Sequence, residues 1–426
     1  MQRETNTYER VLFHMAKSKP MFFAFHLKFS GNISLEDLNK ALSLVRKVYP
    51  LSAVRVEFKP PKKQILTTQN VPDYSVKVEQ PDTDWKQIVA SELGKEFDDS
   101  TGPMVKFNMI PNQDTTHLVA IFHHAVSDGM SAVLFLKKLY RILCTNHGAE
   151  QFEVNWAPTL TEFLTDDIKD ELTRAEFPDW LKYKKHLQTE IVPRPEDIPF
   201  ESTDFHLYSL QLNKENTLEI IKASKEYGVT VHSYLGAILL LLFADEFGEK
   251  QGYQRVIQCP VSFRPFMKNE ASEAFGIYNG IIKSKIDCSP GRSFESVILD
   301  IHNSLHKMIK STDTLKHYYF FIDHMLKGVS DPEALFYSRK EEAGVDYDFS
   351  LSNVGVIKFD DSENKSRILE CHGPIFSAQD GEIVIGVNTA EERLSLTMIF
   401  EKDRFPALAA QKIMQKLESK LASFNK

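Results

Sequence analysis

Short apolar runs alternate with stretches of helical periodicity over the first 145 residues of the chain. Leu38, Leu42 and Val45 recur at helical spacing, so we expect a helix that begins at Ser34 with a capping-box-like sequence. Further helices are predicted over 85–97 and 130–143. Strands are predicted over 22–29, 54–58, 105–110 and 117–122. This alternation predicts an α/β fold.

The same alternation resumes after residue 205. Strands are predicted over 205–212, 255–260, 280–286, 383–388 and 394–400, the last two as a hairpin. Helices are predicted over 216–227, 230–247 and 294–310, with a closing helix from Pro406. Between these halves lies a proline-rich, charged stretch that reads as a packed linker. We therefore expect an N-terminal lobe over 1–165, a linker over 166–204 and a C-terminal lobe over 205–426.

The most informative segment is the HHxxxDG sequence His123 to Gly129, between a predicted strand and a predicted helix. A histidine at a strand end can be held in one rotamer and exchange a proton near neutrality, as a general base must. Asp128 could brace the loop or form a dyad with a histidine, and the spacing does not choose between these roles. The alternative is a structural turn in which Asp128 caps the helix and both histidines are buried. The complete pattern favours the catalytic interpretation.

With these residues the chain resembles the chloramphenicol acetyltransferase-like superfamily. That superfamily includes condensation domains, alcohol O-acetyltransferases, plant BAHD acyltransferases and polyketide-associated acyltransferases. The C-terminal DFGWG of the BAHD proteins and the late RDxSRNPL motif of condensation domains are absent, which favours a free-standing acyltransferase. Further segments resemble family motifs and follow the same order along the chain. Residues 49–55 resemble "HPxLR", with Tyr49 in place of the histidine, and residues 97–106 resemble "FD…GP…R". Residues 228–235 resemble "GVTLxxxL", residues 260–265 resemble "PVxxR", and the segments 275–280 and 350–355 complete the series.

The resemblance implies both a fold and a set of roles. The fold would be a pseudo-dimer of two lobes, each a mixed β-sheet with flanking helices, with the active-site tunnel between them. His124 would be the general base, and His123 would be structural. Asp128 would pair with Arg264 and brace the loop. For the oxyanion, the candidate donors are backbone N–H groups near Gly129 and the side chains of Ser352 and Asn353.

Composition narrows the range of functions. The net charge of −8 over 426 residues argues against a nucleic-acid-binding protein. The four cysteines are scattered without zinc spacing, and no glycine-rich phosphate loop is present. His302 and His306 stand four residues apart, but without a HExxH sequence they are better explained as a solvated helix face. We expect no bound metal and no bound cofactor.

The N-terminal residues are polar and lack the apolar stretch of a secretory signal. The longest apolar run, 235–244, is shorter than the roughly 20 residues that span a bilayer. We therefore expect a cytoplasmic, monomeric protein without a transmembrane segment.

Three functions remain open at this point. The first is transfer of an acyl group from coenzyme A to a small or lipid-like alcohol or an amine, without an acyl-enzyme. The second is a free-standing condensation enzyme of natural-product biosynthesis, which takes its acyl group from a phosphopantetheinyl carrier protein and forms an ester or amide. The third is a non-catalytic binding module, against which the intact His124, Asp128 and Arg264 argue.

Overall fold

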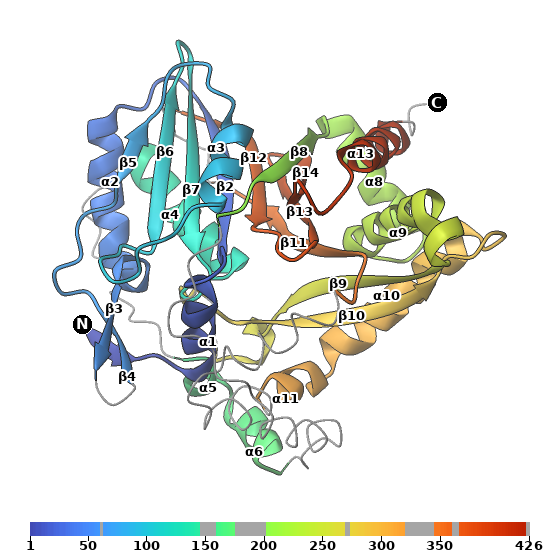
Figure 1. The fold of residues 1–426 in the computed structure, drawn as a ribbon, viewed down its shortest axis with the longest axis horizontal. Helices are drawn as coiled ribbons and strands as arrows, with labels where there is room; N and C mark the ends of the chain where they lie inside the picture. The colour runs from blue at the N-terminus through green and yellow to red at the C-terminus, as the bar shows by residue number, and fades with distance from the viewer. Residues whose placement is uncertain are drawn as a thin grey trace.

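The predicted two-lobe α/β architecture is confirmed (Figure 1). A five-stranded sheet forms the first lobe and a six-stranded sheet forms the second. The structure is a computed structural model, and it describes residues 1–59, 63–144, 159–174, 202–268, 273–319, 345–359 and 366–422.

The first sheet is covered by helices on both faces. Helix α2 (Leu35–Val48) packs beside α4 (Gly129–Cys144) on one face, and α3 (Trp85–Leu93) covers the other. The strand that ends in the HHxxxDG loop is buried on both faces, which explains its continuous apolar run. The strand order is β12 (Ile368–Phe376), β2 (Phe22–Ser30), β7 (Thr115–His123), β6 (Val105–Pro111) and β5 (Val76–Val78).

A small sheet and one helix complete the N-terminal part. Helix α1 (Thr7–Ala16) has an Asn6 capping box and buries its apolar face. Sequence patterning did not single it out. The small sheet has the order β1 (Gln2–Glu4), β4 (Lys63–Thr67) and β3 (Arg55–Lys59). A turn of 3₁₀-helix at Pro50–Ala53 precedes β3 in the chain.

The second sheet is mixed. Its order is β10 (Asn279–Asp287), β9 (Gln254–Ser262), β11 (Phe349–Ile357), β13 (Ile383–Ala390), β14 (Arg393–Glu401) and β8 (Phe205–Gln211). Its main helices are α8 (Lys214–Glu226), α9 (Val231–Gln251), α10 (Phe294–Lys310) and α13 (Ala407–Ala422). Three further helices are short. Helices α5 (Leu160–Phe163) and α6 (Asp166–Arg174) come after α4 in the chain, and α11 (Asp313–Tyr319) comes after α10.

Helix α9 is the one helix in the described part of the chain that is long and apolar enough to cross a membrane, at 21 residues. The helix predicted over 230–247 is confirmed. It continues to Gln251 and ends at Gly252, which has φ +81°, so the apolar run 235–244 is only its middle part. In this fold α9 packs against α10, α13 and β9, and two thirds of its apolar window is buried. It is the central helix of the second lobe's core.

The expected division of the chain at residue 205 does not hold for one strand. Strand β12 belongs to the C-terminal part of the chain, yet it pairs antiparallel with β2 and forms the edge of the first sheet (Figure 1). Most of the linker predicted over 166–204 lies outside the described residues; its first part forms α6. The lobes are thus joined by β12, which leaves the C-terminal part of the chain to pair in the first sheet. We call β12 the exchanged strand.

Element boundaries differ from the predicted ones where glycine ends a helix. The helix predicted over 85–97 ends at Leu93 and is followed by Gly94, where a Cβ would lie 2.0 Å from the carbonyl oxygen of Thr203. The helix predicted over 294–310 and the hairpin of β13 and β14 are confirmed. Strand β12 was missed altogether.

Asn388 on β13 should hold the exchanged strand in place. Its buried Nδ2 donates to the carbonyl oxygens of Cys371 (3.2 Å) and Gly373 (2.8 Å) on β12. We predict that Asn388→Ala lowers the free energy of unfolding by about 2–4 kcal/mol, because it removes two buried hydrogen bonds between β13 and β12. The measurement is urea unfolding, with Asn303→Ala on the exposed face of α10 as the matched control. An unchanged midpoint in Asn388→Ala would contradict this role.

Candidate active site

The HHxxxDG loop connects the end of β7 to the start of α4. Its backbone is fixed at both sides, because His123 N–H donates to Met104 O (3.0 Å) and His124 N–H donates to Met21 O (2.9 Å). The Ser127 hydroxyl closes the turn by donating to His123 O at 3.1 Å. The position of His124 is therefore set by the ends of neighbouring strands.

His124 is held in one tautomer. Its Nδ1 lies 2.8 Å from the carbonyl oxygen of Ser127, and a carbonyl only accepts, so Nδ1 carries the proton and Nε2 carries the lone pair. The ring packs against Phe23 (5.5 Å between centroids) and Phe376 (4.9 Å). Burial lowers the pKa of His124 below 6.5, although the Ser127 carbonyl and Asp128 oppose this shift. At neutral pH the ring is therefore an uncharged base.

His123 is a core residue. It is fully buried among the rings of Phe13, Phe22 and Phe97, at 4.9 to 5.5 Å between centroids. Its Nδ1 accepts from Ala125 N–H at 3.1 Å. Burial, and the neighbouring His124, lower the pKa of His123 to about 3. It does not line the cavity described below.

Asp128 lies behind the loop. One carboxylate oxygen, Oδ2, accepts from Arg264 (2.8 Å) and from Tyr278 N–H (2.9 Å), and Oδ1 accepts from Ser131 N–H (2.8 Å). Burial alone would raise the pKa of Asp128, but Arg264 and these N–H groups outweigh it and lower the pKa. The Asp128 side chain is 4% exposed and that of Arg264 is 11% exposed. The structure thus brings together the pair expected from sequence and makes it a brace.

Ser131 is a further member of this brace that sequence reasoning missed. Its hydroxyl accepts from Arg264 (2.9 Å) and Gly276 N–H (3.0 Å), and it donates to Gly276 O (2.6 Å). Asp128 N–H also donates to Gly276 O, at 3.0 Å. The brace therefore joins the HHxxxDG loop to the segment that leads into β10. The resemblance over 275–280 marked that segment without revealing the contact.

A cavity of about 550 Å³ opens at His124. Its walls come from both lobes, as expected for a tunnel between them. One wall is apolar and is formed largely by α1, with Phe22 and Phe376; the residues of α1 that line it are Tyr8, Val11, Leu12 and Met15. The imidazole of His124 therefore shares the cavity with a group of apolar side chains.

A second part of the lining is polar, and we call it the polar wall. It includes Gln258 of β9, Ser350 of β11, and Gln379 and Glu382 before β13. The Tyr347 hydroxyl donates to the Glu382 carboxylate. Burial raises the pKa of Glu382 above its ordinary value. No motif signalled these residues, because they converge from separate strands.

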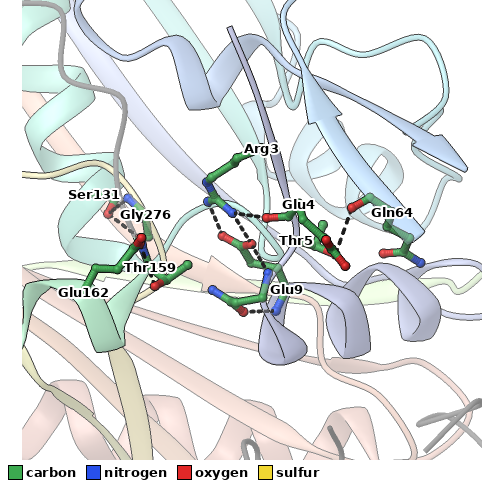
Figure 2. Close-up of polar contacts among 10 residues, drawn as sticks. Arg3, Glu4, Thr5, Glu9, Gln64, Ser131, Thr159, Glu162 and Gly276 are labelled. Atoms are coloured by element: carbon green, nitrogen blue, oxygen red, sulfur yellow. Dashed lines mark hydrogen bonds and ion pairs between the residues drawn. The ribbon is translucent and has the colours of Figure 1, made fainter. Parts of the chain in front are cut away.

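Helix α1 is fixed over the cavity by a buried ion pair. Figure 2 shows Arg3 lying over Glu9, with nitrogen–oxygen distances of 2.7 and 2.5 Å. The Glu9 carboxylate also accepts from Asn6 N–H (2.9 Å), and the Glu9 residue is 2% exposed. This pair anchors the N-terminal turn of α1 and so positions the apolar wall.

The three expected oxyanion donors are not among the cavity-lining residues. Gly129 is buried at the start of α4, where a Cβ would lie 3.0 Å from Val354 Cγ1, so it serves close packing between the lobes. Ser352 lies two residues beyond Ser350 on β11, and Asn353 Oδ1 accepts from the N–H of Gly355 at 2.8 Å. Among the described residues, Ser350 is the hydroxyl of β11 that reaches the cavity.

Metal ligands were not expected from sequence, and the spacing of His302 and His306 gave the only signal. Their rings stack on α10 at 5.3 Å between centroids. The described residues do contain one group of three possible ligands, His26, Glu370 and His372, on the first sheet. Sequence spacing could not reveal this group, because β12 comes late in the chain.

The chain belongs to the Condensation domain family, which matches residues 9–425. Bacitracin synthase 3 of Bacillus licheniformis is 26% identical over 169 residues, which are 38% of this chain and 3% of that protein. This chain therefore spans a small fraction of the length of that curated relative.

Solved structures share the fold. The TRI3 trichothecene 15-O-acetyltransferase of Fusarium sporotrichioides is similar with a TM-score of 0.69 and 14% identity, covering 99% of this chain and 95% of that one. The first condensation domain of the calcium-dependent antibiotic synthetase has the same TM-score and identity, covering 100% and 97%. These likenesses confirm the two-lobe fold expected from the resemblance.

Asp128 and Arg264 should behave as one unit. We predict that alanine at either position lowers the free energy of unfolding by about 3–5 kcal/mol, because it leaves a buried charge unpaired. The double variant should cost much less than the sum of the two. The measurement is a double-mutant cycle by denaturant unfolding, with the exposed pair Glu36 and Lys40 as the control cycle. Additive effects at Asp128 and Arg264 would rule out the coupling.

Proposed function

We propose that this protein is an acyltransferase that moves an acyl group from a thioester to an alcohol or amine. The observation that carries the proposal is the state of His124, whose Nδ1 is committed to Ser127 O while the ring lines a cavity between the lobes. Its Nε2 lone pair is then the basic atom of the site. Membership of the Condensation domain family supports this chemistry.

In the proposed mechanism, Nε2 of His124 takes the proton from the acceptor hydroxyl or amine as that group attacks the thioester carbonyl. The new carbon–oxygen or carbon–nitrogen bond gives a tetrahedral intermediate. As the intermediate collapses, the carbon–sulfur bond breaks and the imidazolium of His124 returns the proton to the leaving thiolate. The base is regenerated without an acyl-enzyme. Asp128 acts at a distance, by holding the loop with Arg264.

Much of the rate would come from holding two substrates together, which supplies up to about 7–11 kcal/mol in favourable cases. The oxyanion needs hydrogen-bond donors. We assign this role to Ser350 ahead of Ser352, Asn353 and the N–H groups near Gly129, because Ser350 lines the cavity with His124.

We favour coenzyme A as the donor and a small or lipid-like molecule as the acceptor. We propose that the reaction uses no bound metal or other cofactor, and that the enzyme is cytoplasmic and monomeric. The apolar wall of α1 supports such an acceptor, and the polar wall at Gln258 and Glu382 would bind its hydroxyl or amine groups. The alternative is an acyl group delivered by a phosphopantetheinyl carrier protein to form an ester or amide. The family match supports this second donor.

His124→Ala should abolish transfer while the fold stays intact, because no other base is assigned at the cavity. His123→Ala should mainly lower stability, since it removes a ring from a packed core. The measurements are turnover and thermal unfolding of both purified variants. A folded His124→Ala enzyme with near-wild-type turnover would show that the base is another group.

The pH dependence of kcat/KM should follow the protonation of His124. Its pKa is lowered from 6.5 by burial, and the neutral form is the base, so activity should be at its plateau at pH 7. Activity should fall as pH decreases, with a midpoint below 6.5. The measurement is a pH profile of kcat/KM between pH 5 and 8, alongside circular dichroism to exclude unfolding. A midpoint above 7 would contradict the assignment.

The donor is tested by incubation with a panel of acyl-coenzyme A thioesters and a panel of acylated carrier proteins. Thiol release and a new ester or amide are expected with coenzyme A thioesters when a mixture of alcohols and amines is present. Release only with acylated carrier would establish the alternative donor. Release with neither, in protein of native circular dichroism, would favour the non-catalytic function.

A further inference from the structure

A group of ionisable side chains lies on the face of the first sheet that α3 covers. His372 of β12 stands opposite His26 of β2, and Glu370 stands opposite Lys28. His117 of β7 stands opposite Lys28 on the other side. The group thus crosses three adjacent strands from distant parts of the chain. It is separate from the cavity at His124, which none of these residues lines.

Three of these side chains converge. One ring nitrogen each of His26 and His372 and one carboxylate oxygen of Glu370 all lie within 4.8 Å of one another. His372 Nε2 is 3.7 Å from Glu370 Oε2. Ligand atoms of a tetrahedral zinc ion, each at about 2.0–2.2 Å from the metal, lie about 3.3–3.6 Å apart. Small side-chain movements would therefore bring all three atoms to ligand distance.

Two ring nitrogens in the group are buried without a protein partner. These are Nδ1 of His26 and Nδ1 of His372, which have no hydrogen bond to any described residue. His26 Nε2 lies 2.9 Å from His117 Nδ1. If Nε2 of His26 donates there, its Nδ1 carries the lone pair that a metal requires, and His117 acts as the outer group that orients a ligand. A buried polar atom without a partner is otherwise rare.

One carboxylate oxygen of the group faces the histidines. Lys28 Nζ contacts Glu370 Oε1 at 3.0 Å and leaves Oε2 toward His372. Trp85 stacks on His26 (4.1 Å, 3° between planes) and on His372 (4.9 Å, 24°), which keeps both rings on this face of the sheet.

We propose that His26, His372 and Glu370 bind one divalent transition-metal ion, of which zinc is the type best matched to two imidazoles and a carboxylate. The ion would cross-link β2 to the exchanged strand β12. His26 pairs with Val119, which lies four residues before His123 on β7, or about 13 Å along the strand. The site therefore stabilises the joining of the lobes and takes no part in acyl transfer. This inference does not depend on the proposed function.

The test uses the full chain, stripped with chelator and then dialysed against Zn²⁺ or Co²⁺. We expect one metal ion bound per chain, a rise in Tm on adding metal, and visible absorption of the cobalt form typical of tetrahedral coordination. Acyl transfer by the stripped protein, assayed well below its Tm, should be unchanged. Loss of transfer that only metal restores would overturn the purely structural role.

The ligand variants are Glu370→Gln and His372→Gln, and the matched control is His306→Gln, which disrupts the other histidine pair. We expect at least a tenfold loss of zinc affinity in both ligand variants and no change in the control. Glu370 is partly exposed, so its variant should fold even if His372→Gln does not. Three results would overturn the proposal. The wild-type chain does not bind zinc stoichiometrically, Glu370→Gln leaves zinc affinity unchanged, or His306→Gln is the variant that loses zinc binding.

Discussion

The structure depends on a single buried carboxylate. Asp128 cannot stay ionised in the interior without compensation, and Arg264, Ser131 N–H and Tyr278 N–H provide it. These partners come from both lobes, so satisfying one charge also fixes how the lobes meet. The loop between β7 and α4 is then held rigid, and His124 faces the cavity in one tautomer. The position of His124 thus depends on how the charge of Asp128 is compensated behind the loop.

Local patterns were sufficient to predict the parts of the fold that local forces determine. Alternating and helical periods located the strands and helices, and Ser34 capped its helix as its spacing indicated. Boundaries shifted where tertiary packing decided them, as at Gly94. The pair of Asp128 and Arg264 was foreseeable through the resemblance, because both members lie in recognisable motifs.

Features that arise from distant segments meeting could not be foreseen. Strand β12 has no pattern that says which sheet it joins, and its choice is determined by packing against β13 and by Asn388. Gln258 reaches the cavity from β9 and Glu382 from the segment before β13, and Ser350 reaches it where Ser352 does not. The group of His26 and His372 exists only because β12 pairs with β2. A one-dimensional sequence holds no signal for such meetings.

The exchange of β12 has a consequence for biosynthesis. Lys28 on β2 and Glu370 on β12 are 342 positions apart, so translation at about 5–20 residues per second separates the two strands by roughly 20 to 70 seconds. During that interval one edge of β2 has no strand beside it and presents free N–H and C=O groups to other nascent chains. The first sheet gains its edge strand only after Phe376 has been made. Until then, that edge of β2 is a place where another extended segment could pair in place of β12.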